Sequence, residues 1–268
     1  MSLGDAIGRL APVLPEFPAG EVWLAGAGPG SLGCLTLEVV AALGAADAVV
    51  YDALVAPEAL GAARAEAERH FVGKRRGELS VAQEAINALL VRLAGEGKRV
   101  LRLKGGDPNI FGRGGEEALA LARAGVPFRV LPGVTSAFGA LASARIPATR
   151  RGVSKALILA TGHGVGTEGD LDWGALARTG QPLVIYMGLA VIGEIAAALM
   201  AGGLAAATPA AVIASATTPA ERVLVADLGT IAARVAAEGM PSPALIVVGE
   251  IVRLREELLA LTRAEAGA

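Results

Sequence analysis

The 268-residue chain carries 24 basic and 26 acidic side chains, for a net charge of −2, and 53% of its residues are hydrophobic although only 3% are aromatic. This length favours two domains, and the near-neutral charge argues against a nucleic-acid binder that neutralises many phosphates. The longest charge-free stretch, residues 195–220, is interrupted by glycine, threonine and proline, so no membrane span is expected.

The chain opens with residues 1–20, where Pro12, Pro15 and Pro18 predict a loose lead-in without the pattern of a signal peptide. Short β-branched runs then predict buried strands of a parallel sheet, at residues 22–25, 48–51, 100–103, 128–131, 157–160, 183–186, 211–214 and 245–248. Helical patterns lie between most of these runs, at residues 35–43, 80–93, 115–124, 137–144, 191–200 and 230–237. Alternating strands and helices predict an α/β fold.

A strand stops at Pro132-Gly133, where we place the joint between two α/β domains, residues 21–132 and 133–255. A charged amphipathic helix is predicted over residues 252–268, with residues 256–268 forming a C-terminal tail. Cysteine and histidine are scarce. The single Cys34 fits a reducing cytoplasm, and the widely separated His70 and His163 predict no zinc site.

A glycine-rich turn follows the first predicted strand and matches G-x-G-x-x-G at residues 28–33, with Asp52 at the end of the next strand. By its sequence this segment matches the dinucleotide-binding fingerprint. However, Pro29 removes one backbone N–H from the turn, and the helical pattern begins only after the last glycine. From this stretch alone, a nicotinamide or flavin site and a ligand-free turn both remain open.

Further motifs follow in a fixed order: K-G-G-D-P at residues 104–108, G-R-G-G-E-E at 112–117, P-G-V-T-S-A at 132–137, T-G-H at 161–163 and Y-M-G at 186–188. From about residue 22 to residue 253, this set resembles the tetrapyrrole methylases. The resemblance implies two α/β domains with the active site in the cleft between them, a homodimer, and S-adenosylmethionine in place of a dinucleotide. It also implies a set of cofactor contacts: Pro29, Gly105, Gly106, Asp107, Ile110, Thr135, Ser136, Met187 and Ala216.

Two of these groups also have simpler interpretations. Asp107 can take a hydrogen bond from a ribose hydroxyl or an ammonium group, or it can merely close an Asp-Pro turn after the strand. Thr135 and Ser136 can contact the cofactor, cap the following helix, or do both.

The resembled enzymes methylate uroporphyrinogen III at C2 and then C7 to give precorrin-2, consuming two molecules of S-adenosylmethionine and releasing S-adenosylhomocysteine. By this resemblance Asp52 is the proton acceptor and Lys74 the proton donor, although Asp52 can also cap the next turn. Such an acidic substrate requires bases, and loop segments supply Lys74-Arg75-Arg76, Arg113 and Arg150-Arg151.

Among these, Arg113 and Arg151 are the predicted substrate contacts, together with Glu116; each arginine alone could equally be a surface charge. Glu116 can orient Arg113, accept a pyrrole N–H, or simply be a first-turn glutamate favoured by the helix dipole.

The sequence departs from the family at Ser31, Asn109 and Arg150, where Asp, Phe and His are usual, which leaves a shifted preference among tetrapyrroles open. The competing hypotheses are a sister precorrin methylase, an NAD-linked oxidoreductase and a non-catalytic tetrapyrrole carrier. The length leaves no room for the dehydrogenase and chelatase domain fused to some relatives, so methylation alone is expected, with no nucleic-acid or membrane partner.

Overall fold

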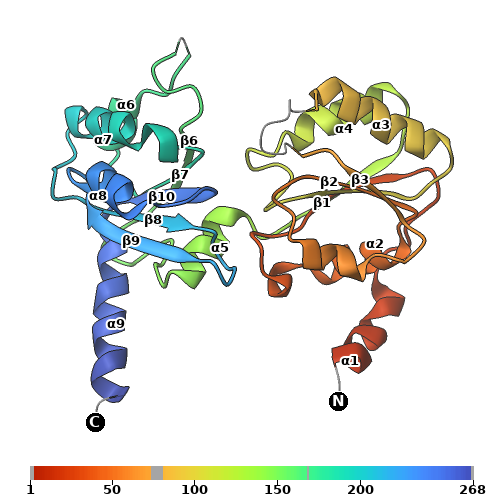
Figure 1. The fold of residues 1–268 in the computed structure, drawn as a ribbon, viewed down its shortest axis with the longest axis horizontal. Coiled ribbons are helices and arrows are strands. Elements are labelled where there is room, and N and C mark those ends of the chain that lie inside the picture. Colours follow the sequence, from red (N-terminus) through yellow and green to blue (C-terminus); the bar gives the residue numbers. More distant parts are fainter. Residues whose placement is uncertain (1–2, 74–80, 168, 267–268) are drawn as a thin grey trace. The chain divides into compact units, whose positions relative to one another are not determined.

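The computed structural model describes residues 3–73, 81–167 and 169–266. The chain divides into two compact units, residues 1–136 and 137–268, and each contains one five-stranded sheet with helices against it (Figure 1). The predicted α/β class is confirmed, and the division falls four residues beyond the predicted joint. No helix in the described ranges is long and apolar enough to cross a membrane.

The sheet of the first unit is entirely parallel, with the strand order β3-β2-β4-β1-β5. Its strands are β1 (Val22–Gly26), β2 (Ala48–Tyr51), β3 (Glu68–Phe71), β4 (Val100–Lys104) and β5 (Phe128–Leu131). All but β3 were predicted. Because the strands are parallel, their carboxyl ends lie along one edge of the sheet.

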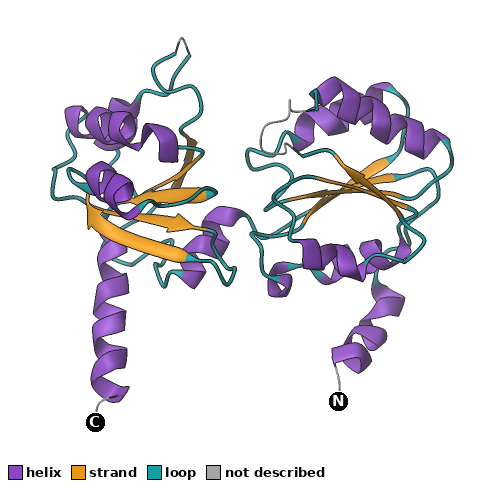
Figure 2. Cartoon of the chain, in the orientation of Figure 1, coloured by secondary structure: helices purple, strands orange, loops and turns teal. Residues whose placement is uncertain are grey.

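Helices cover both faces of this sheet (Figure 2), which explains why β1 is apolar at every position. They are α2 (Leu37–Ala45), α3 (Gln83–Gly95) and α4 (Gly114–Arg123). Val22 and Leu24 pack in one core cluster with Leu90 of α3, whereas Trp23 and Ala25 pack in another that includes α2. The sheet is therefore the middle layer of an αβα unit.

A carboxylate ties the amino ends of β2 and β4 together. Asp47 accepts hydrogen bonds from the Arg99 backbone N–H (3.0 Å), the Arg99 Nε (2.8 Å) and Nη2 (3.0 Å), and the Arg64 Nη1 (3.2 Å). The Arg99 side chain is the main reason that the pKa of Asp47 is lowered from 3.8 to about 2. This ion pair fixes the register at the end of the sheet opposite to the carboxyl ends of the strands.

Replacing Asp47 with asparagine is expected to reduce the free energy of unfolding at neutral pH by about 2 kcal/mol. Because the pKa of Asp47 is lowered in the folded state, its contribution is present in full above the unfolded value and is lost as the pH falls from about 4 towards 2. Urea unfolding from pH 7 to pH 3 should show the difference between wild type and variant shrinking. A constant difference over that range would contradict the assignment.

The second unit has a mixed sheet with the order β6-β7-β10-β8-β9. Its strands are β6 (Ile158–Thr161), β7 (Leu183–Tyr186), β8 (Pro209–Ala214), β9 (Arg222–Asp227) and β10 (Ala244–Val248). Only β6 and β7 pair in parallel, and β10 is antiparallel to both of its neighbours. The prediction of parallel strands throughout is therefore wrong here, and β9 was not predicted.

Helices α6 (Trp173–Arg178), α7 (Ile192–Ala201) and α8 (Ile231–Glu238) pack on one face of this sheet, and α5 (Ser136–Ser143) packs on the other (Figure 1). The predicted terminal helix is present as α9 (Arg253–Ala266). The loose lead-in is wrong in part, because Leu3–Leu10 forms helix α1, which ends before Pro12.

Candidate functional site

The carboxyl ends of the first sheet gather many of the predicted site residues. Asp52 follows β2 directly, Gly105 to Asp107 follow β4, and Pro29 lies in the turn after β1. Thr135 and Ser136 lie a few residues after β5, at the start of α5. In α/β proteins ligands bind just beyond the carboxyl ends of the parallel strands, so these positions form a candidate site.

Three glycines bring the main chains of β1, β4 and β5 into direct contact at this edge. A Cβ atom on Gly26 would lie 2.5 Å from the Gly106 carbonyl oxygen, and one on Gly133 would lie 2.3 Å from the same oxygen. Beyond the strands, Gly28 and Gly106 exchange backbone hydrogen bonds of 3.1 and 2.7 Å. Four glycines, of which Gly28 belongs to the glycine-rich turn, therefore serve contacts between peptide groups.

The dinucleotide hypothesis for this segment is not favoured. A dinucleotide site presents the first N–H groups of a helix to the pyrophosphate. Here α2 begins at Leu37, after the last glycine of the motif, and its N-cap Thr36 accepts a hydrogen bond from the Val39 N–H with its Oγ1 (3.3 Å).

Asp107 closes the turn after β4. Its Oδ1 accepts a hydrogen bond from the Asn109 N–H (2.9 Å), and its Oδ2 accepts one from the Gly133 N–H (3.0 Å). The Asp-Pro turn is therefore formed, and it links β4 to the segment after β5. A carboxylate oxygen has two lone pairs, so the half-buried side chain retains acceptor capacity for a ligand.

The loop from residue 108 to residue 114 turns tightly on Pro108. The Gly114 N–H donates to the Pro108 carbonyl (2.9 Å), and a Cβ on Gly112 would lie 2.6 Å from that oxygen. Between these glycines Arg113 has a φ of 58°, in the left-handed region. The half-buried Ile110, a predicted cofactor contact, belongs to the same loop.

Arg113 and Glu116 form a bidentate ion pair, with Nε–Oε1 and Nη2–Oε2 distances of 2.8 and 2.6 Å. The guanidinium lowers the pKa of Glu116. Both side chains are more than half exposed, so the pair contributes little stability and can exchange for another anion at low cost. Glu116 thus orients Arg113, one of the roles that the sequence suggested.

Asp52 is held from two directions. Its Oδ1 accepts a hydrogen bond from the Leu54 N–H (3.1 Å), while its Oδ2 lies 3.6 Å from the Nη2 of Arg102 on β4. The predicted turn cap is therefore present, and a buried cation faces the second oxygen. Lys74, the predicted proton donor, lies outside the described residues.

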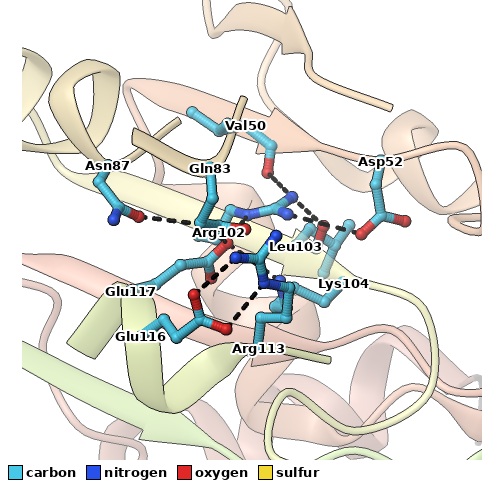
Figure 3. A network of polar contacts seen from close by, with 10 residues as sticks. All are labelled: Val50, Asp52, Gln83, Asn87, Arg102, Leu103, Lys104, Arg113, Glu116 and Glu117. Carbon is cyan, nitrogen blue, oxygen red and sulfur yellow. Dashed lines mark hydrogen bonds and ion pairs between the residues drawn. The ribbon is translucent and has the colours of Figure 1, made fainter. Parts of the chain in front are cut away.

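A buried polar network adjoins Asp52 (Figure 3). Arg102 and Lys104 both donate to the Oε1 of Glu117 on α4, over 3.1 and 3.0 Å, and Gln83 of α3 donates to the same atom over 3.3 Å. Burial lowers the pKa of the Lys104 ammonium and the charge of Arg102 lowers it further, while Glu117 opposes both effects.

Sequence reasoning assigned no role to this network. The available signal was the apolar strand V-L-R-L-K, in which two charged residues lie two positions apart and so on one face. Buried charges need a partner of opposite sign, which pointed to a buried carboxylate elsewhere in the unit.

The second unit presents its own predicted positions at one edge. Strands β7 and β8 are both antiparallel to β10 and so run in the same direction, which places Met187 and Ala216 at the same edge. Met187 is 54% exposed at a φ of 52°, and the buried Ala216 lies between two residues with φ of 48° and 65°. The Tyr186 hydroxyl accepts a hydrogen bond from the Ala137 N–H (2.9 Å), tying α5 to the end of β7.

The paired arginines of the second unit have different surroundings. Arg151 is exposed in the turn after α5, where the sequence placed a substrate contact. Arg150 forms an exposed ion pair with Glu257 of α9 over 3.4 Å.

Comparison with known proteins gives a consistent result. The family model "Tetrapyrrole (Corrin/Porphyrin) Methylases" matches residues 21–232. Siroheme synthases of Azotobacter vinelandii and Stutzerimonas stutzeri are 51% and 49% identical over 93% and 96% of the chain. These matches cover 54% and 55% of those proteins, so the chain spans about half the length of the curated relatives it matches.

Solved structures agree with the fold. Uroporphyrin-III C-methyltransferase from Thermus thermophilus is 42% identical with a TM-score of 0.74, covering 89% of this chain and 98% of that one. A structure of the enzyme from that organism complexed with S-adenyl homocysteine gives 40% identity and a TM-score of 0.74, over 87% and 99% of the two chains. A cobalt precorrin-4 methyltransferase is 24% identical with a TM-score of 0.80, a likeness of fold alone.

Proposed function

Because the chain belongs to the tetrapyrrole methylases, we propose that it is an S-adenosylmethionine-dependent C-methyltransferase that converts uroporphyrinogen III to precorrin-2 by methylation at C2 and C7. The observation that carries the proposal is the match, at 42% identity, to nearly the whole of a uroporphyrin-III C-methyltransferase. The strand-end site of the first unit supports it with the geometry described above.

S-adenosylmethionine supplies an electrophilic methyl group on a sulfonium, and S-adenosylhomocysteine is the product. The complex of a relative with S-adenyl homocysteine supports this cofactor. We assign its binding to the predicted set: Pro29, Gly105, Gly106, Asp107, Ile110, Thr135, Ser136, Met187 and Ala216. In the first unit there is no room for larger side chains at Gly26 and Gly133. Main-chain groups and the Asp107 carboxylate are therefore the groups that would bind the cofactor at the strand ends.

The chain has little covalent work in such a methyl transfer, since it aligns the two reactants and accepts the ring proton that leaves after methylation. Asp52 is the proposed proton acceptor and Lys74 the proposed donor. Arg113 binds a substrate carboxylate by releasing Glu116, because a bidentate guanidinium fits either carboxylate and the existing pair is exposed. Arg151 provides a second positive charge for the carboxylates of the substrate.

We further propose that the protein acts in the cytoplasm as a homodimer. The single cysteine fits a reducing compartment, and the resemblance to the family suggests the dimer. Light scattering of the purified protein tests the assembly, and a mass equal to that of one chain would contradict it.

The cofactor assignment predicts that Asp107→Ala weakens S-adenosylhomocysteine binding at least about tenfold, because a charge-assisted hydrogen bond is lost together with the tie to Gly133. Calorimetric titration of wild type and variant measures the change, with NAD and NADP as control ligands. Asp47→Asn, which breaks carboxylate contacts at the opposite end of the same sheet, should bind as the wild type does. Saturable NAD binding without S-adenosylhomocysteine binding would overturn the proposed function.

A further inference from the structure

The guanidinium that faces Asp52 is fixed from several sides. Arg102 is 3% exposed, and its Nη1 donates to the Val50 and Leu103 carbonyls over 3.4 and 3.2 Å. Its Nε donates to Glu117, and its Nη2 lies 3.6 Å from Asp52. Each of its nitrogens faces an acceptor, so the group has one favoured orientation.

Glu117 is fully buried on α4, and its Oε1 receives the donors from Arg102, Lys104 and Gln83. Its Oε2 is buried without a hydrogen-bond partner among the described residues. An incompletely bonded buried carboxylate is a poor way to stabilise a core, since apolar residues of similar volume are often at least as stabilising. The arrangement therefore points to a role in the site.

The charges around Asp52 come from several elements. Strand β4 contributes the cations Arg102 and Lys104, α4 contributes Glu117, and α3 contributes the neutral Gln83 (Figure 3). The exposed Arg113–Glu116 pair is drawn in the same view and is neutral as a pair. Glu117 is thus the buried anion that both buried cations contact.

We propose that Glu117 is a positioning residue for the methylation: by holding Arg102, it sets the direction and strength of the positive charge that Asp52 faces. The inference rests on the proposed function and extends it to Glu117, which is linked to Asp52 through Arg102. When Asp52 takes up the ring proton it loses its charge, and Arg102 remains paired with Glu117. After the proton transfer Arg102 therefore still contacts a carboxylate, which it shares with Lys104.

Glu117→Gln tests the inference, because the amide keeps the shape and an acceptor oxygen but removes the charge. We expect kcat for uroporphyrinogen III to fall about 10- to 100-fold, with KM and the S-adenosylhomocysteine affinity within about twofold of wild type. The acidic midpoint of the pH–kcat profile should move to lower pH, because the uncompensated cations favour ionised Asp52. Arg102→Met should move it to higher pH.

Gln83→Met is a milder variant, which removes only one of the three donors to Glu117. It should lower kcat about threefold, the size expected for one hydrogen bond, and it keeps the test decisive where Glu117→Gln does not fold. Asp47→Asn is the matched control, since it breaks the partly buried Asp47–Arg99 ion pair at the amino ends of β2 and β4. It should lower stability while leaving kcat and the pH profile as in wild type.

Wild-type kcat and an unshifted profile in folded Glu117→Gln, or in Gln83→Met should the former not fold, would overturn this inference alone. The same losses in Asp47→Asn would also overturn it, because reduced stability would then explain them. A wild-type protein that does not methylate uroporphyrinogen III would instead overturn the proposed function, and this inference with it.

Discussion

Asp52→Asn should lower kcat for methylation of uroporphyrinogen III by about 10²- to 10⁴-fold, the usual contribution of a positioned acid or base. Asparagine keeps an oxygen that can accept the Leu54 N–H bond, so the turn after β2 stays in place. It cannot take up the proton that leaves the ring. Anaerobic single-turnover methylation measures the loss, and S-adenosylhomocysteine affinity should be unchanged.

The matched control for this variant is Glu96→Gln, which removes an exposed carboxylate that pairs with Arg92 and Lys98. It should retain wild-type kcat. An Asp52→Asn variant with more than about a tenth of wild-type activity would mean that solvent or another group receives the proton.

Gly133→Ala should reduce the free energy of unfolding by about 3 kcal/mol, at the upper end for overpacking. Its Cβ would lie 2.3 Å from the Gly106 carbonyl oxygen and 2.7 Å from the Gly26 Cα. These neighbours are backbone atoms of two adjacent strand ends, so they cannot give way as a flexible side chain would. Urea denaturation measures the change, and S-adenosylhomocysteine binding should weaken as the edge opens.

Gly44→Ala is the control, because this glycine lies within α2 and a Cβ there meets nothing within 4 Å. That variant should be neutral or more stable by up to about 1 kcal/mol, from helix propensity. Equal stability of the two variants would show that the three strand ends can separate without cost.

Strands β1 and β8, both of which were predicted, are buried along their whole length, and continuous apolar runs identify them. Strand β3 was missed because E-R-H-F is polar. It lies at the edge of its sheet and pairs only with β2, so it needs less apolar surface. Strand β9 is also an edge strand, with Arg222 and Asp227 at its ends.

Strand direction in the second sheet could not be predicted from composition. A buried run such as A-L-I-V-V in β10 satisfies a parallel or an antiparallel neighbour equally well. Strands β8 and β9 pair antiparallel across the connection of residues 215–221, which the sequence patterns did not identify as a hairpin.

The candidate site was predictable where its residues are consecutive in the chain, as in K-G-G-D-P. The buried network was not, because Glu117 is 13 residues from Lys104 and its importance depends on which face of α4 is buried. Neighbouring helical residues point in different directions, so Glu116 is exposed while Glu117 is fully buried.

The contact of peptide groups at Gly26, Gly106 and Gly133 limits how this protein can diverge. Only glycine fits at these positions, so we expect these three residues to stay constant while the residues around them change. New preferences among tetrapyrroles should then arise in the loops that border these glycines. Asn109 lies in one such loop. A substitution there would change a loop side chain and leave the contacts between the glycine backbones in place.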